Sequence, residues 1–197
     1  EAATRKAQDL VRMAVGAMTR ATPLRDYEIP MNRDVLVIGG GVSGMSSALE
    51  LADQGYKVFL AERSGRLGGM ASLVQRTLEG EAVQPFLAQL IEKTGAHPHI
   101  EVITQAIVVD HYGMPGQFRT GFQIGPRMHY RQIDHGATVL ATGAMANRPK
   151  AFLLDAHPAV LSQLDLGILL ENQPQKPTEW QSVVMIQCVG SRTEENP

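Results

Sequence analysis

The sequence contains very little cysteine. Cys188 is the only cysteine among 197 residues. A single cysteine excludes a disulfide bond within the chain, because such a bond joins two thiols. The same scarcity suits a reducing compartment, so we expect a cytoplasmic protein.

An excess of charge of one sign and a long apolar run are also missing. The formal net charge is -2 and the sequence pI is about 6.3. This balance gives no electrostatic reason to expect nucleic acid or an acidic membrane surface as a partner. No stretch approaches the roughly 18 apolar residues of a membrane span, and no secretory signal pattern opens the chain. We therefore expect no direct membrane insertion.

The chain starts at Glu1 and stops at Pro197, directly after a strand-like run. We expect it to be a fragment of a longer protein. Its composition fits a globular fold with a sizeable core. We divide it into an N-terminal helix and linker (1–30), a nucleotide-binding domain (31–150) and the truncated start of a following α/β segment (151–197).

The first segment has helical periodicity over residues 2–19, with Leu10, Val11 and Ala14 recurring on one side. A docking or linking helix is the simpler interpretation, and a partner-binding helix is the alternative. Residues 21–30 contain two prolines and indicate a connector.

A strand–helix–strand unit follows. An apolar strand over 34–38 leads into a glycine cluster, a helix over 43–54 that ends at Gly55, and a strand over 57–61. Such a unit predicts a parallel sheet with a right-handed crossover.

The remaining pattern predicts a helix over 81–94, with Phe86, Leu87, Leu90 and Ile91 on its apolar side, and a strand over 101–104. Short β-like runs over 106–132 indicate an antiparallel meander, and a buried strand over 137–141 follows it. The last segment predicts a helix over 161–171, a loop over 172–180 and a buried strand over 182–189. The expected fold is α/β: a three-layer Rossmann-like domain with a parallel sheet and an antiparallel meander.

The glycine cluster reads Gly39-x-Gly41-x-x-Gly44 and lies between the first strand and its helix. In a dinucleotide-binding unit, the first glycine allows the tight turn and the second lets the backbone approach a diphosphate. The third permits close packing of helix on strand. The helix start, with Val42 and Ser43, is then expected to hold the diphosphate through N–H groups and the helix dipole.

Glu62 lies 18 residues after Gly44, at the end of the second strand. A carboxylate at this position can accept hydrogen bonds from both hydroxyls of an adenosine ribose, and it disfavours a 2′-phosphate. NADP is therefore not expected, while NAD and FAD remain. The alternative for Glu62 is a solvated strand end.

The stretch after Glu62 favours FAD. Gly68-Gly69, followed by Met70, resembles the extended FAD fingerprint of the glutathione-reductase-like flavoproteins, and the resemblance places Arg63 near the adenine. Ala141-Thr142-Gly143 resembles a second flavin motif of that superfamily, in which a buried strand ends close to the cofactor. The resemblance also implies that Ile107 and Val108 contact the adenine through backbone groups.

Three longer stretches resemble one family, namely the flavoprotein A subunits of heterodisulfide reductases. They read "AQDLVRMAVGAM", "LIEKTGAHPHIEVIT" and, most specifically, "VVMIQCVGSRTEENP". The resemblance implies FAD as cofactor, other subunits of a heterodisulfide reductase-type complex and redox proteins as partners, and electron bifurcation in several members.

The chain departs from this family in its cysteine content. A [4Fe–4S] cluster needs about four cysteine thiolates, so none is expected here, and clusters are expected only in parts of the full-length protein that this chain lacks. A second GxGxxG motif, which glutathione-reductase-like enzymes place in a separate nicotinamide domain, is also missing, so we expect no NAD(P)H site.

The remaining candidates are single residues. Cys188, in an apolar run, is interpreted as an inert buried thiol, with a redox role as the alternative. His111, His129 and His135 are interpreted as solvated or core histidines, although one of them could approach the flavin. No metal site and no catalytic side chain are expected.

The sequence thus predicts an FAD-binding electron-transfer module of a heterodisulfide reductase-type A subunit. Two alternatives stay open: a generic FAD-dependent oxidoreductase of a small molecule, and a non-catalytic nucleotide-binding scaffold.

Overall fold

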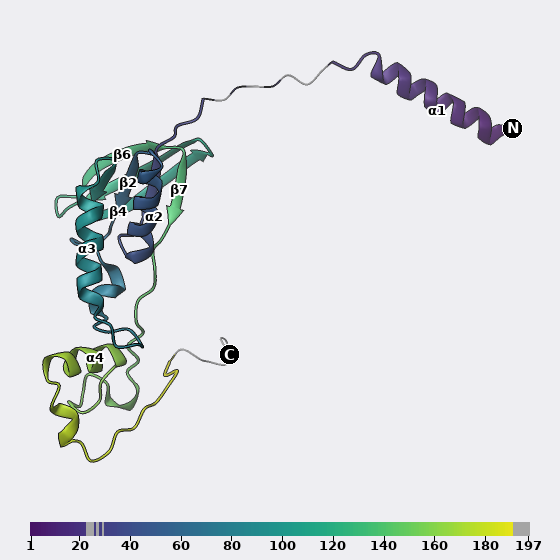
Figure 1. Cartoon of the computed structure of the whole chain (residues 1–197). Coiled ribbons are helices and arrows are strands. Elements are labelled where there is room, and N and C mark those ends of the chain that lie inside the picture. Colours follow the sequence, from purple (N-terminus) through teal and green to yellow (C-terminus); the bar gives the residue numbers. More distant parts are fainter. Residues whose placement is uncertain (23–25, 27, 29, 191–197) are drawn as a thin grey trace. The chain divides into compact units, whose positions relative to one another are not determined.

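The computed structural model describes residues 1–22, 26, 28 and 30–190 of the chain. It contains two compact units, Glu1–Pro30 and Met31–Pro197. The first unit holds helix α1 (Ala2–Met18), which confirms the predicted helix (Figure 1). No residue of α1 is buried. The predicted connector over 21–30 lies partly outside the described residues.

The second unit is built on a parallel sheet of four strands in the order β3-β2-β1-β7. The strands are β1 (Val35–Ile38), β2 (Val58–Ala61), β3 (Ile100–Ile103) and β7 (Ala137–Leu140). Helix α2 (Val42–Asp53) connects β1 to β2, which confirms the predicted strand–helix–strand unit. Gly55, with a φ of +88°, turns the chain after the helix.

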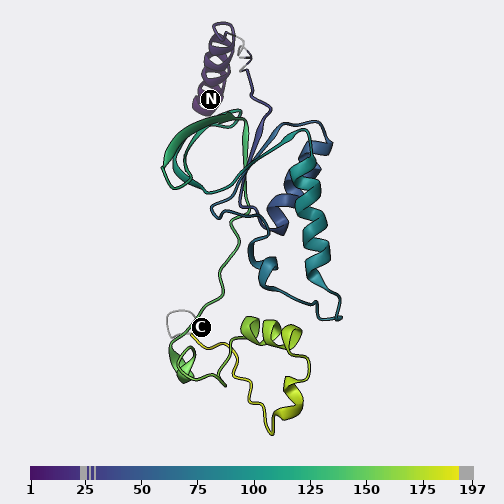
Figure 2. The same cartoon turned by 90° about the vertical axis from the view of Figure 1, so that its left-hand side faces the viewer.

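The meander forms a separate antiparallel sheet. Its strands are β4 (Ala106–Met114), β5 (Gln117–Ile124) and β6 (His129–His135), in the order β4-β5-β6. The meander was predicted over 106–132, so it extends three residues further. Figure 2 shows it on the side of the parallel sheet opposite to helix α3 (Val83–Ala96).

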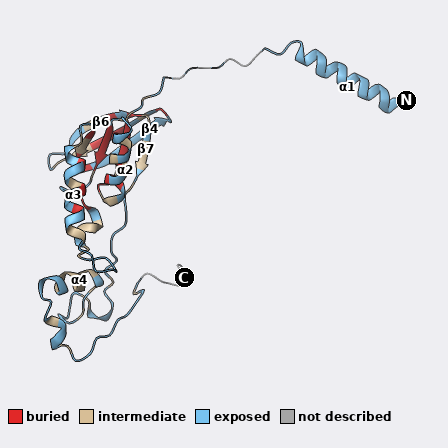
Figure 3. Cartoon of the chain, in the orientation of Figure 1, coloured by how far each residue is buried: buried red, intermediate tan, exposed pale blue. Residues whose placement is uncertain are grey.

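Side chains alternate along the parallel strands and give the sheet two apolar faces. Val35 and Val37 pack with α2 and α3, whereas Leu36 between them packs under the meander. The first core also contains Met45, Ala48, Ala52, Val58, Leu60, Leu87, Leu90 and Ile100; the second contains Phe59, Ala61, Ile103, Ala106, Phe122 and Ile133. The buried segments in Figure 3 lie at these elements. The expected three-layer α/β architecture is therefore confirmed.

Helix α3 differs in detail from the prediction. It begins and ends two residues later than 81–94, and Phe86 is 55% exposed rather than part of the apolar side. The buried side is formed by Leu87, Leu90 and Thr94, which recur at helical spacing. Phe86 directly precedes Leu87, so it points away from this side.

The last part contains two short 3₁₀ helices, Ala151–Leu153 and Lys176–Glu179, around helix α4 (Gln163–Asn172). Ser162 caps α4 and forms a capping box with Asp165, which explains where the helix begins. The helix was predicted over 161–171.

The predicted buried strand over 182–189 is wrong. Residues 182–189 form no strand, and Val184 is 83% exposed. An apolar run becomes a strand only when another strand pairs with its backbone N–H and C=O groups, and none of the described strands pairs with this run. Cys188 is exposed, with a φ of +57°, so its interpretation as a buried thiol is also wrong.

Candidate functional site: the carboxyl ends of three parallel strands

The residues that follow β1, β2 and β7 meet at one edge of the parallel sheet. The backbone N–H of Gly39, after β1, donates a 2.8 Å hydrogen bond to the carbonyl of Ala61 in β2. The N–H of Ala141, after β7, donates a 2.8 Å hydrogen bond to the carbonyl of Ile38 in β1. After β1 the chain continues through α2 to β2, which lies beside β1 on one side, whereas β7 lies beside β1 on the other side. In open α/β sheets, ligands bind at such a switch point.

Two glycines of the first loop are required by close backbone packing. Gly39 has a φ of +115°, and a Cβ on it would overlap the carbonyl of Ala141. A Cβ on Gly44 would overlap the carbonyl oxygen of Gly39. The start of α2 therefore lies directly against the turn that leaves β1, as the motif predicts for its third glycine.

Gly41 is different, because a Cβ on it would meet nothing within 4 Å. Gly41 is the N-cap of α2, and the helix begins at Val42, one residue before the predicted Ser43. The N–H groups of a first helical turn have no acceptor within their helix. The open space beside Gly41 and these N–H groups fit a diphosphate, with Val42 and Ser43 among the donors.

Glu62 is held in place by the backbone. Its Oε2 accepts a 2.6 Å hydrogen bond from the N–H of Gly40, and its Oε1 accepts a 2.7 Å hydrogen bond from the N–H of Ser64. Partial burial raises the pKa of Glu62, but the hydrogen bonds from Ser64 and Gly40 and the nearby Arg63 outweigh it, so the pKa lies below its ordinary value. Glu62 is therefore an oriented carboxylate, and its free lone pairs can still accept hydrogen bonds from hydroxyl groups.

The sequence did not reveal why position 40 is a glycine. A Cβ on Gly40 would lie 2.5 Å from Cδ2 of Leu67 and 3.0 Å from Cβ of Glu62. A side chain there would displace the carboxylate. The signal in the sequence was the middle glycine of Gly39-Gly40-Gly41, which the dinucleotide motif does not require.

The second glycine pair packs on the first loop. The N–H of Gly68 donates a 2.8 Å hydrogen bond to the carbonyl of Gly40. Gly68 and Gly69 have φ values of +121° and +52°, and a Cβ on Gly69 would lie 3.1 Å from the Cα of Gly41. The 3₁₀ helix Gly69–Leu73, which includes Met70, starts here.

The other predicted contact residues lie around this edge. Arg63 is exposed, and its Nη2 lies 3.9 Å from Sδ of Met145. Ile107 and Val108 are 44% and 37% exposed at the start of β4, next to Ala106, whose N–H donates a 2.9 Å hydrogen bond to the carbonyl of Glu62. Ala141, Thr142 and Gly143 follow β7, and Gly143 has a φ of +63°.

A hollow of about 770 Å³ extends from this region toward the last part of the chain. Met70 and Met145 line it, together with Ser162 and Cys188. Met145 and Ser162 were not predicted as site residues, because no motif marks them, and Cys188 was interpreted as an inert buried thiol. The size lies within the range of small-molecule pockets.

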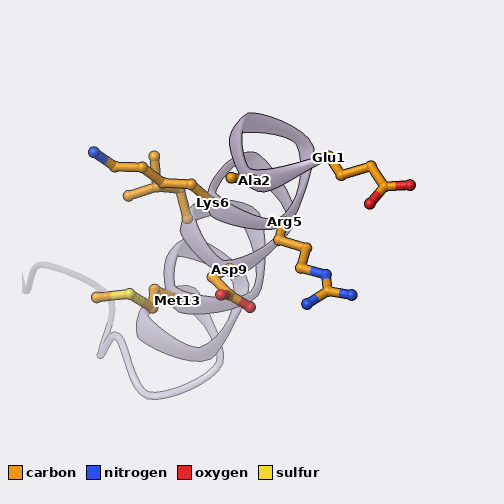
Figure 4. A pocket seen from close by; sticks show the side chains of 7 residues that line it. Glu1, Ala2, Arg5, Lys6, Asp9 and Met13 are labelled. Atoms are coloured by element: carbon orange, nitrogen blue, oxygen red, sulfur yellow. The ribbon is translucent and has the colours of Figure 1, made fainter.

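The first unit has a hollow of its own along α1 (Figure 4). The residues that line it all belong to this one helix: Glu1, Ala2, Arg5, Lys6, Asp9, Leu10 and Met13. Because a single helix surface encloses nothing, this hollow is no candidate site.

Metal clusters and membrane-spanning helices are both absent from residues 1–22, 26, 28 and 30–190. These residues contain no group of three or more His, Cys, Asp or Glu side chains placed to hold a metal ion. None of their helices is both long enough and apolar enough to cross a bilayer.

Comparison with known proteins gives matches of three kinds. A family model described as FAD dependent oxidoreductase matches residues 34–127. An iron-sulfur A subunit of the CoB–CoM heterodisulfide reductase of Methanopyrus kandleri is 41% identical over 153 residues, which cover 77% of this chain and 23% of the relative. The corresponding iron-sulfur A subunit of Methanocaldococcus jannaschii is 35% identical over 156 residues, with the same coverage of 77% and 23%.

Among solved structures, L-proline dehydrogenase from P. horikoshii superimposes with a TM-score of 0.52 and 25% identity, over 64% of this chain and 26% of that one. The chain covers less than a quarter of the length of each of the two A subunits described above. These matches show that residues 34–127 are similar to FAD dependent oxidoreductases and that the chain is similar to part of the A subunits of heterodisulfide reductases.

Proposed function

We propose that the chain binds FAD and serves as the electron-transfer module of a heterodisulfide reductase-type A subunit. The observation that carries the proposal is the meeting of Gly41 and Glu62 at the carboxyl ends of the parallel strands. Gly41 leaves open space at a helix start, and Glu62 offers an oriented carboxylate. A diphosphate and a ribose need these two features side by side.

In this proposal each part of the edge has a task. The start of α2 holds the diphosphate through N–H groups, and Glu62 accepts hydrogen bonds from both ribose hydroxyls. The backbone at Ile107 and Val108 and the side chain of Arg63 lie beside the adenine. Gly68, Gly69, Met70 and residues 141–143 border the flavin. FAD supplies the redox chemistry when bound, and the protein orients and tunes it.

The relatives support the assignment to a larger assembly. The names of both relatives described above are those of iron-sulfur subunits of heterodisulfide reductases. Because this chain has one cysteine, we place any iron–sulfur clusters in other parts of the full-length protein. Cytoplasmic location, partner subunits and electron bifurcation in the complete complex rest on the family resemblance.

The region between the second glycine pair and β7 argues against a generic small-molecule oxidoreductase. Such an enzyme needs a cap that forms a substrate pocket. This region is occupied by strand β3, which belongs to the parallel sheet, and by helix α3 and the meander, which pack on that sheet.

The test is to incubate the purified chain with FAD, remove free FAD, and record the visible spectrum before and after reduction by dithionite. We expect stoichiometric bound flavin that is reduced and then reoxidised by an artificial one-electron acceptor. Bound FAD that cannot be cycled would favour the scaffold alternative, and a folded chain without bound FAD would refute the proposal.

A further inference from the structure

Three side chains of the meander form a continuous hydrogen-bonded chain. Nδ1 of His111 lies 2.8 Å from Oγ1 of Thr120, which lies 2.8 Å from Nε2 of His135. Nδ1 of His135 lies 3.0 Å from the carbonyl oxygen of Ala137, the first residue of β7. Thr120 and His135 are fully buried, whereas His111 is an exposed residue. This series of hydrogen bonds therefore runs from the surface at His111, through β5 and β6, to the parallel sheet.

The chemistry of the ends fixes the direction of each bond. A carbonyl oxygen only accepts, so Nδ1 of His135 carries the hydrogen. In a neutral imidazole Nε2 is then an acceptor, so the Thr120 hydroxyl donates to it. The Thr120 oxygen is left to accept, so Nδ1 of His111 donates. Both rings are thereby assigned to the Nδ1–H tautomer, and Nε2 of His111 keeps its lone pair.

The surroundings of His135 include few charges. Burial lowers the pKa of His135, the Ala137 carbonyl and Asp134 raise it, and His111 lowers it; the net shift is downward. Asp134 on β6 pairs with Arg119 on β5 at 3.1 Å.

The remaining neighbours of His135 are uncharged or aromatic. β7 contributes the Thr138 hydroxyl at 3.5 Å, and the Phe118 ring lies 5.7 Å from the His135 ring. The two histidine rings are 5.9 Å apart, so two positive charges would repel each other strongly.

From this geometry we propose that His111, Thr120 and His135 act as one proton-accepting relay, which carries a proton from the surface of the meander to the buried ring of His135. The proposal rests on the meander alone and does not depend on FAD binding.

The relay takes up one proton without losing a hydrogen bond. A proton binds Nε2 of His111, the Nδ1 proton of His111 passes to the Thr120 oxygen, and the hydroxyl proton of Thr120 passes to Nε2 of His135. One proton enters, His111 becomes the neutral Nε2–H tautomer, the positive charge lies on His135, and both bonds to Thr120 reverse direction. A second proton would place cations on both rings, so the pair resists it.

The direct test is long-range ¹H–¹⁵N correlation spectroscopy of the histidines in the whole chain from pH 8 to 5. We expect His111 as the Nδ1–H tautomer at pH 8, and a common titration midpoint for His111 and His135. Thr120→Val removes the hydroxyl at nearly constant volume. We expect it to shift the midpoint of His135 at least one pH unit downward and to let His111 titrate alone.

Two further variants serve as controls. Thr120→Ser keeps the hydroxyl and should restore the common midpoint, and His129→Gln removes an exposed histidine of β6 and should leave it unchanged. If Thr120→Val does not fold, the tautomer of His111 in the unmodified chain at pH 8 tests the relay instead. The Nε2–H tautomer of His111 at pH 8, or separate midpoints that Thr120→Val leaves unchanged, would overturn the relay.

Discussion

Oε2 of Glu62 accepts a 2.6 Å hydrogen bond from the backbone N–H of Gly40. This bond joins the turn after β1 to the end of β2, so the glycine loop and the acidic residue form one structure. It also gives Gly40 a physical role, because a side chain there would meet Leu67 and Glu62. The carboxylate is oriented before any ligand arrives, which reduces the entropy cost of binding.

Glu62→Gln should weaken FAD binding at least tenfold. The amide keeps the shape of the side chain, but its NH₂ group would face one of the two backbone N–H donors that now bind the carboxylate. We also expect the free energy of unfolding to fall by about 1 kcal/mol. Fluorescence titration with FAD and thermal unfolding measure the two effects. Glu92→Gln, an exposed change on α3, is the matched control, and equal FAD affinity in both variants would contradict the assigned role.

The lowered pKa of Glu62 predicts how FAD binding depends on pH. Because the folded-state pKa lies below its ordinary value of 4.5, the side chain stays ionised from neutral pH down to that value. Its contribution to stability is present above pH 4.5 and is lost as the pH falls through the folded-state pKa. FAD affinity measured between pH 7 and 4 should therefore be flat until about pH 4.5 and fall below it. A Glu62-dependent loss that begins above pH 5 would show that the pKa is raised instead.

Gly44→Ala should destabilise the fold by about 1–3 kcal/mol, because the added methyl overlaps the carbonyl of Gly39 and the backbone must move. Gly95→Ala is the matched change. Gly95 lies within α3, and its added methyl meets nothing within 4 Å. That variant should gain about 0.5–1 kcal/mol from helix propensity. Urea unfolding compares the two, and equal stabilities would contradict the tight contact between α2 and the turn.

Leu36→Ala should cost about 2–5 kcal/mol of unfolding free energy, since it opens a cavity between the parallel sheet and the meander. Val184→Ala should change stability by less than about 0.5 kcal/mol, because Val184 is exposed. Chemical denaturation of both variants tests the second core and the exposed run together. A large loss from Val184→Ala would mean that residues 182–189 pack as a buried strand after all.

The sequence allowed the central fold to be predicted because its signals are local. Glycines follow β1 and α2, apolar runs mark the buried strands β1 and β2, and short β-like runs between Gly and Pro mark the meander. The strand predicted over 137–141 forms as β7, but it is not buried as expected. The position of Glu62 at the strand ends followed from its spacing after Gly44, whereas Gly68 followed from the resemblance to a flavoprotein fingerprint. Their role as FAD contacts remains a prediction.

What the sequence did not reveal depends on tertiary contacts. The run "VVMIQCV" has the composition of a strand, but composition does not supply a pairing partner. Phe86 and Leu87 are both apolar neighbours, and only packing decides which is buried. The bond from Gly40 to Glu62 and the hydrogen bonds from His111 through Thr120 to His135 join residues that are distant in the sequence, and no motif records them.

The central claim is that the open space beside Gly41 receives the diphosphate of FAD. The most direct test compares FAD binding to the unmodified chain and to Gly41→Val, by calorimetric titration of proteins shown to be folded by circular dichroism. A Cβ added at Gly41 would meet no atom within 4 Å, so we expect the variant to fold. We predict one FAD per unmodified chain and at least a hundredfold weaker binding to Gly41→Val, with unchanged binding to Gly95→Ala. Equal FAD affinity of the unmodified chain and Gly41→Val, or no binding to the folded unmodified chain, would contradict the account.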